Sequence, residues 1–317
     1  MTIDPAAFDS AAVTAETAAF NRQLEATLAA APKTHEVAPA ASRAARAEGR
    51  SIFPHGGPAP GSEWREAPTH PGRVRVTPAP GEAAGVFIHI HGGGWTIGAA
   101  DQADLWCQYL AREAGVAVVS IPYRLAPENP WPAPADDAEA GALWVLENAA
   151  RLFGTDRIAI GGESAGAHLA AVTLGRLKAR GLGGRIHAAL MHYGVFDLAM
   201  TPSMANWGAR QLILSTPTIA WFVKNLIAGD GSLAADAAAS PIRADLSGMP
   251  PALFQCGTND PLLDDTLFMA ARWLAAGAKA ELNLYPGGAH AFDMFDLAIA
   301  REARAAAARF LKARLAA

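Results

Sequence analysis

Ser164 is the residue whose surroundings point most directly to chemistry. It lies in the run Gly162-Glu-Ser-Ala-Gly166, which follows an apolar stretch at 157–161 and precedes an Ala- and Leu-rich helical pattern. A serine on a sharp turn between a strand and a helix projects its hydroxyl above the sheet, and such a turn needs glycines because its neighbours pack closely. The pattern predicts a nucleophilic serine, provided that partners for it occur elsewhere in the chain.

An activated serine needs a base and a carboxylate that orients the base, and candidates for both follow Ser164. Asp260 comes just after an expected strand at 252–256, and His290 follows an expected strand at 280–284. The order Ser, Asp, His is that of a nucleophile on such a turn in a parallel sheet, where sites form at the carboxyl ends of strands. We expect Ser164 to be the nucleophile, His290 the general base and Asp260 the orienting acid.

A glycine run, His91-Gly-Gly-Gly-Trp95, offers backbone N–H groups that could stabilise an oxyanion. The run follows an expected strand at 85–90, and glycines let N–H groups approach a substrate closely. The amides of Gly93 and Gly94 are expected to form the oxyanion hole together with the amide of Ala165, the residue after the nucleophile.

Other polar residues near these motifs are interpreted as structural. Asp264 and Asp265 are expected to begin a helix, because carboxylates are stabilised at a helix N-terminus. His89 and His91 alternate on one strand without a third ligand, so no metal site is predicted, and His91 is expected to bind the glycine loop. The side chain of Glu163 is expected to point away from the nucleophile and to make a structural hydrogen bond.

The elements that must position these residues alternate between strands and helices. Six segments are predicted to be strands: 85–90, 116–121, 157–160, 188–191, 252–256 and 280–284. Most are continuously apolar, as is typical of parallel strands covered on both faces. Helical patterns occur at 104–113, 136–148, 167–180, 266–276 and 299–315. This alternation predicts an α/β fold with a mostly parallel central sheet and helices on both faces. Polar and apolar residues alternate at 72–77, which predicts a half-exposed antiparallel strand.

Two segments are expected to form a helical cap over the site. Residues 1–52 carry helical patterns at about 5–28 and 40–48, and residues 197–239 form a long connection with apolar residues of their own. Those apolar residues either line an acyl pocket or form the core of the cap. Residues 53–196 and 240–317 are then the two parts of the α/β core.

Composition excludes several classes of partner. With 26 Lys and Arg against 30 Asp and Glu the net charge is −4, and no basic block favours nucleic acid or an anionic membrane surface. We expect a cytoplasmic protein without stable membrane insertion, because there is no long apolar run and no secretion signal pattern. Cys107 and Cys256 are expected to be small core residues. A homodimer is left open.

The motifs together resemble those of the hormone-sensitive-lipase-like esterases, a family with the α/β-hydrolase fold. The resemblance rests on segments 91–95, 123–133, 162–166, 260–262 and 290–292, which occur in the family's order. It implies hydrolysis of carboxylic esters with short to medium acyl chains through an acyl-enzyme intermediate, with no cofactor and no metal. Glu163 and His168 depart from the family pattern and leave the chain-length preference open.

The expected function is therefore that of a serine carboxylesterase acting on a small-molecule ester. An amidase or arylformamidase would use the same Ser164, Asp260 and His290, because an acyl-enzyme mechanism accepts different leaving groups. The third alternative is a non-catalytic small-molecule receptor on this fold. The intact triad argues against a receptor, since a protein that only binds needs no base.

Overall fold

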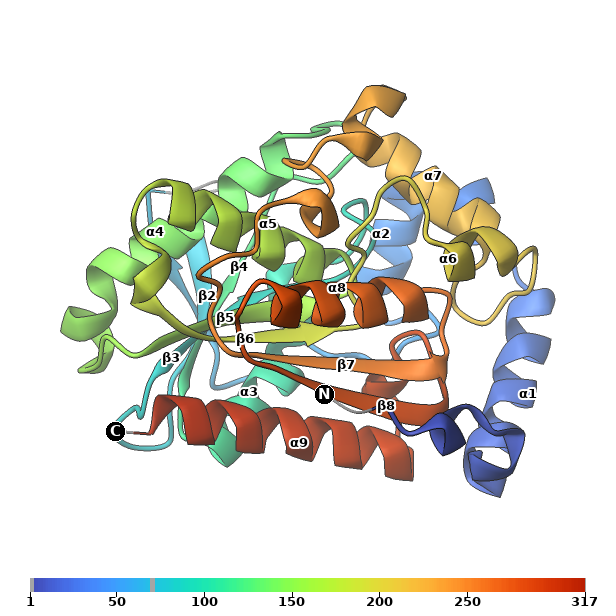
Figure 1. Cartoon of the computed structure of the whole chain (residues 1–317), viewed down its shortest axis with the longest axis horizontal. Coiled ribbons are helices and arrows are strands. Elements are labelled where there is room, and N and C mark those ends of the chain that lie inside the picture. Colours follow the sequence, from blue (N-terminus) through green and yellow to red (C-terminus); the bar gives the residue numbers. More distant parts are fainter. Residues whose placement is uncertain (1–2, 69–71, 317) are drawn as a thin grey trace.

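The computed structural model describes residues 3–68 and 72–316, which contain one eight-stranded sheet (Figure 1). The strands are β1 (Glu63–Glu66), β2 (Arg73–Thr77), β3 (Val86–Ile90), β4 (Ala117–Ile121), β5 (Ile158–Glu163), β6 (Ile186–His192), β7 (Ala252–Asn259) and β8 (Ala280–Ala289). Their spatial order is β1-β2-β4-β3-β5-β6-β7-β8. The β1–β2 and β2–β4 pairs are antiparallel, and every pair from β4 to β8 is parallel.

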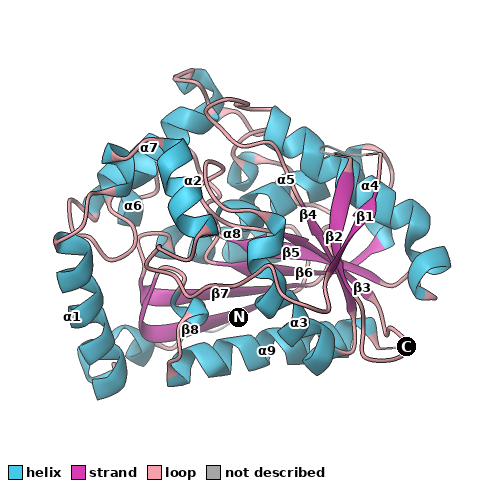
Figure 2. Ribbon diagram, turned by 180° about the vertical axis from the view of Figure 1, so that it is seen from behind, coloured by secondary structure: helices cyan, strands magenta, loops and turns pink. Residues whose placement is uncertain are grey.

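Two layers of helices cover the sheet. The helices are α1 (Ala15–Ala29), α2 (Pro39–Ala47), α3 (Asp104–Ala114), α4 (Ala133–Phe153), α5 (Ala165–Ala179), α6 (Pro202–Asn206), α7 (Thr216–Leu226), α8 (Leu263–Ala275) and α9 (Ala298–Leu315). Ile88 and Ile90 of β3 pack in the core that α4, α5 and α8 complete, whereas Phe87 packs with α3 and α9 on the opposite face. Figure 2 shows the two layers from behind. The predicted α/β fold is confirmed.

Helices α1, α2, α6 and α7 lie beyond the carboxyl ends of the strands (Figure 1). Leu24 of α1 is buried in a cluster with Leu212 and Ala289. The Nδ1 atom of His35, just before α2, lies 2.9 Å from the hydroxyl oxygen of Thr218 in α7. The N-terminal segment and the segment after β6 are therefore in contact with each other, and α1 also reaches the end of β8.

The N-terminal helix is shorter than the pattern at 5–28 predicts. It begins at Ala15, with Thr14 as its N-cap, and two short 3-10 turns precede it. The carboxylates of Asp4 and Asp9 accept hydrogen bonds from the N–H groups of Ala6 and Ala11, so each starts a separate turn. Local capping by aspartate therefore outweighs the helical preference of the alanines.

The antiparallel strand predicted at 72–77 is present as β2, but the expectation that it is half exposed is wrong. Residues Val74–Thr77 are buried, including Arg75, whose guanidinium pairs with the buried carboxylate of Asp104. The charged strand β1, which the periodicity of the sequence does not predict, pairs with β2 and forms the edge of the sheet. An ion pair with α3 thus lets an arginine occupy a position that the sequence pattern assigns to solvent.

Strands β5 and β8 extend further than predicted, to Glu163 and Ala289. The glycines at the end of β5 fit there because no side chain could: a Cβ at Gly161 would lie 2.1 Å from the Leu190 carbonyl oxygen, and one at Gly162 would lie 2.0 Å from that of Ile90. The extensions bring residues 164 and 290 directly to the ends of the two strands.

The described ranges contain no helix with the length and apolar character needed to cross a bilayer. Cys107 and Cys256 are buried and not joined in a disulfide.

Candidate active site

Ser164 occupies a strained turn between β5 and α5. Its backbone has φ 55° and ψ −119°, a conformation that non-glycine residues rarely adopt. The turn passes close to β3, because a Cβ at Gly166 would lie 1.9 Å from the Ile90 carbonyl oxygen. Strain of this kind persists only where the surrounding structure enforces it, and here it holds the hydroxyl above the sheet.

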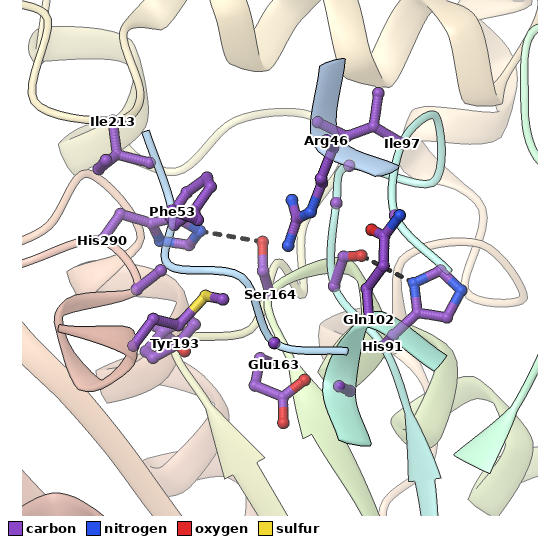
Figure 3. Close-up of a pocket in the computed structure, with 18 of the residues that line it drawn as sticks. Arg46, Phe53, His91, Ile97, Gln102, Glu163, Ser164, Tyr193, Ile213 and His290 are labelled. Carbon is purple, nitrogen blue, oxygen red and sulfur yellow. Dashed lines mark hydrogen bonds between the residues drawn. The ribbon is translucent and has the colours of Figure 1, made fainter. Parts of the chain in front are cut away.

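The three predicted residues form a continuous chain of hydrogen bonds (Figure 3). His290 Nε2 lies 3.0 Å from Ser164 Oγ, and His290 Nδ1 donates to Asp260 Oδ2 at 2.9 Å. The second carboxylate oxygen of Asp260 accepts the Leu262 N–H at 2.8 Å. The Asp260 side chain is fully buried and that of His290 is 5% exposed, so water does not compete for the bond between them. An imidazole held between a hydroxyl and a buried carboxylate can take the hydroxyl proton.

The neighbouring aspartates are bound elsewhere. Asp264 accepts the Ser203 N–H at 2.8 Å, and Asp265 accepts the N–H groups of Phe196 and Asp197. Burial raises the pKa of Asp265 to about 7. Both residues lie in the first turn of α8, as expected, and neither bonds to His290.

The glycine loop between β3 and α3 has positive φ angles and close contacts that favour glycine. Gly93 has φ 121° and Gly94 has φ 57°. A Cβ at Gly93 would lie 2.1 Å from the Ile97 carbonyl oxygen, and one at Gly94 would lie 2.2 Å from the Phe222 ring of α7. Within residues 3–68 and 72–316, neither N–H of these two glycines has an acceptor. The loop therefore presents two unpartnered donors beside the serine turn.

Two neutral histidines hold this loop. His91 Nδ1 donates to the Gly92 carbonyl at 2.9 Å, and the His91 ring stacks on Tyr123 with the ring centres 4.2 Å apart. His168 Nδ1 accepts from the Trp95 indole N–H at 3.1 Å, so its Nε2 donates to the Ala239 carbonyl at 2.7 Å. Burial lowers the pKa of each histidine to about 4. His168 thus ties the loop to the end of the segment after β6, a role that the sequence did not indicate.

The buried His89 and the partly buried Glu163, whose side chain is 17% exposed, form a pair under the serine turn. The Glu163 carboxylate accepts from His89 Nε2 at 3.0 Å, and His89 Nδ1 lies 2.8 Å from the Ser120 hydroxyl. Burial alone would lower the pKa of His89, but the facing carboxylate reverses the effect and raises it well above its usual value. Burial would raise the pKa of Glu163, but the attraction of His89 lowers it. Glu163 therefore has the structural role that was expected, as half of an ion pair.

A second aspartate network, not found from the sequence, supports His290. Tyr193 packs edge-on against the His290 ring, with 4.9 Å between centres, and its hydroxyl donates to Asp293 Oδ1 at 2.5 Å. His192 Nδ1 donates to the other oxygen of Asp293 at 3.0 Å. Asp293 lies only three residues after His290, but its partners come from the end of β6, so no local pattern could reveal the network.

Ser164 and His290 open into a pocket with a cavity volume of about 360 Å³. Its apolar lining includes Phe53, Ile97, Ile213, Ile219 and Phe222. Phe53 lies at the start of the expected core, Ile97 follows the glycine run, and the other three belong to the segment after β6. The apolar residues of 197–239 therefore contribute to the pocket as well as to the core. Among residues 3–68 and 72–316, no group of three or more His, Cys, Asp or Glu side chains could hold a metal ion.

Fold and site together define an α/β hydrolase. Residues 87–294 match the model of a family described by the alpha/beta hydrolase fold, and the chain belongs to this family. It is 38% identical to the carboxylic ester hydrolase LipN of Mycobacterium tuberculosis, over 69% of this chain and 60% of LipN. It is also 38% identical to the carboxylesterase NlhH of the same species, over 74% of this chain and 75% of NlhH. The match thus spans less than two thirds of LipN but three quarters of NlhH.

Among solved structures, the chain is similar to a hormone-sensitive lipase from a metagenome library. The TM-score is 0.83 and the identity 27%, over 95% of this chain and 98% of that protein. The resemblance expected from the five motifs is therefore confirmed.

Proposed function

We propose that the protein is a serine carboxylesterase that hydrolyses short to medium acyl-chain esters through an acyl-enzyme intermediate. Ser164 attacks the ester carbonyl, His290 takes its proton and passes it to the departing alcohol, and Asp260 holds the imidazole in the required tautomer. The observation that carries this proposal is the buried hydrogen-bond chain from Asp260 through His290 to Ser164. The names of LipN and NlhH support ester hydrolysis.

In this proposal the amides of Gly93, Gly94 and Ala165 stabilise the oxyanion of the tetrahedral intermediate. The unpartnered N–H groups of the two glycines support it, as does the position of Ala165 at the first residue of α5. Donors fixed before the reaction need no reorganisation as charge develops, and removing one donor from such a hole typically costs about 3–4 kcal/mol of activation free energy.

We also propose that residues 1–52 and 197–239 form a cap over the core of residues 53–196 and 240–317. The contact of His35 with Thr218 and the pocket-lining positions of Arg46, Ile213 and Phe222 support this division. A cap that closes the pocket limits the length of the acyl chain and excludes water.

The proposed partner is a small ester, and the net charge of −4 is unfavourable for binding nucleic acid. Two buried, unpaired cysteines support a cytoplasmic location.

Turnover of p-nitrophenyl esters of increasing acyl length, together with an aryl acetate and its anilide, tests the proposal. We expect kcat/KM to be highest for short to medium chains and the ester to be hydrolysed much faster than the anilide. A preference for the anilide would indicate an amidase. A preference for long-chain lipids presented at an interface would contradict the short-acyl assignment.

A further inference from the structure

Arg46, near the end of α2, places its positively charged guanidinium in the pocket. No described residue of the chain forms a hydrogen bond or an ion pair with this charge. Its side chain extends from the helix toward Ser164 (Figure 3). Within the described residues its guanidinium makes no hydrogen bond and no ion pair, and its one specific contact is a cation–π contact with Phe53, 5.0 Å from the ring centre. A guanidinium has five N–H donors, so most of its capacity to bind is unused.

Arg43, one turn earlier in α2, shows how the same helix satisfies an arginine that has a structural role. Its guanidinium donates to the Thr96 and Ala126 carbonyls at 2.8 Å and to both oxygens of Glu128 at 2.9 and 2.7 Å. Arg43 therefore anchors α2 to the glycine loop. Since the anchor is complete without Arg46, holding the helix in place does not explain why a second cation faces the pocket.

The acidic groups around the pocket are already engaged by other residues. Glu163 pairs with His89, and Asp293 accepts from His192 and Tyr193, while its backbone carbonyl accepts from Arg304. The other titratable side chains that line the pocket or act on Arg46 are tyrosines and histidines, which supply no negative charge at neutral pH: Tyr109, Tyr123, Tyr193, His55, His91 and His290. Burial lowers the pKa of Arg46, in keeping with a cation that lacks a compensating carboxylate.

Gln102 adds a second free polar group at the same place. Its side chain lines the same pocket as that of Arg46 (Figure 3), and its Oε1 is buried without a hydrogen-bond partner in the described part of the chain. Buried polar groups are normally satisfied, so an unpaired amide oxygen and an unpaired guanidinium in one pocket indicate a place for a polar ligand group. The amide can turn to offer either its N–H₂ donors or its oxygen.

We propose that Arg46 binds a carboxylate carried by the substrate, so that the preferred esters are carboxylate-bearing ones, with Gln102 as a second polar contact. This inference rests on the proposed esterase function and narrows its substrate class. A planar guanidinium recognises a carboxylate through two parallel hydrogen bonds, and charge-assisted bonds of this kind strengthen where water is excluded. Arg46 lies outside residues 87–294, so the proposed specificity belongs to this chain's N-terminal segment and not to the shared family region.

Two pairs of substrates test the proposal and locate the carboxylate. On the acyl side, ethyl hydrogen glutarate is compared with its neutral methyl-ketone isostere. On the alcohol side, the acetate ester of γ-hydroxybutyrate is compared with its methyl-ketone isostere. The readout is the ratio of kcat/KM for the charged ester to that for the neutral one, in the wild type, Arg46→Met and Arg46→Lys. Arg50→Met is the matched control, because Arg50 belongs to the same segment but its side chain is 62% exposed and pairs with Glu48.

We expect Arg46→Met to lower this ratio about 10- to 100-fold in the pair whose carboxylate reaches Arg46, as loss of charge-assisted hydrogen bonds predicts. The change should fall mainly on KM, Arg46→Lys should restore part of it, and Arg50→Met should leave the ratio unchanged. An unchanged ratio in both pairs, or an equal loss for charged and neutral esters, would overturn the proposal and make Arg46 a packing partner of Phe53. If the wild type hydrolyses none of these four esters and no p-nitrophenyl ester, the proposed esterase function itself is wrong.

Discussion

The role of Asp260 can be tested with the substitution Asp260→Asn, whose effect follows from the two hydrogen bonds of the carboxylate. One oxygen accepts the Leu262 N–H at 2.8 Å and the other accepts from His290 Nδ1 at 2.9 Å. An asparagine oxygen should stay on the Leu262 N–H, which places the amide N–H₂ against Nδ1. The imidazole proton then moves to Nε2, and Nε2 can no longer accept the proton of Ser164.

The size of the loss combines two effects. Turning the amide to restore the active tautomer would leave the buried Leu262 N–H facing an N–H₂ group, at a cost of about 1–3 kcal/mol, which keeps the active form to a minor population. The imidazolium that forms during attack also loses its stabilising carboxylate. Together these effects should lower kcat about 10³- to 10⁴-fold, in line with the ~10⁴-fold loss for the equivalent change in serine proteases.

Steady-state turnover of a short-chain aryl ester measures this loss, and urea unfolding checks that the variant is folded. Asp264→Asn is the matched control, because Asp264 accepts from the Ser203 N–H and does not reach His290, so this variant should keep most of its activity. A loss of less than about tenfold in Asp260→Asn would show that the tautomer reasoning is wrong. An equal loss in both variants would remove Asp260 as the orienting acid.

Two further predictions concern the pH dependence of stability. Glu163→Gln removes the partner of His89, so the free energy of unfolding should fall by about 1–3 kcal/mol, with the largest difference from wild type between the ordinary pKa values of 4.5 and 6.5. That difference should shrink as pH falls through the lowered pKa of Glu163 or rises through the raised pKa of His89. Urea unfolding measured from below the first of these pKa values to above the second would contradict the pair if the difference stayed constant. Because the pKa of Asp265 is raised to about 7, the protonated carboxyl stabilises the folded state at low pH. This stabilisation is lost as pH rises through that value. Asp265→Asn should therefore gain roughly 3–4 kcal/mol relative to wild type between pH 4 and 8, and a pH-independent difference would refute this.

The parts of the site that the sequence predicts are those with a local signature. The glycines around Ser164 are required by close approach to Ile90, and such a requirement leaves a short motif in the chain. Asp260 and His290 were expected after strands because parallel strands bring their carboxyl ends to one edge. The predicted end of the strand before His290 was too early, because Gly287 and Gly288 suggest a turn although they continue β8.

The parts that could not be predicted depend on partners distant in sequence. Arg46 stands among alanines in a short helix, and nothing nearby distinguishes it from the anchoring Arg43. The link from Trp95 through His168 to Ala239 joins three separate segments, and Tyr193 reaches Asp293 from just after the end of β6. Contacts of this kind arise from the tertiary arrangement and leave no periodic pattern.

The most direct test of the serine mechanism is covalent labelling with a diethyl aryl phosphate, followed by mass spectrometry of the peptides. Inactivation should accompany one diethyl phosphoryl adduct per chain, located on Ser164, and Ser164→Ala should be folded, inactive and unlabelled under the same conditions. An adduct on another residue that accounts for the inactivation, or near-normal ester turnover by Ser164→Ala, would contradict the assignment of Ser164 as the nucleophile.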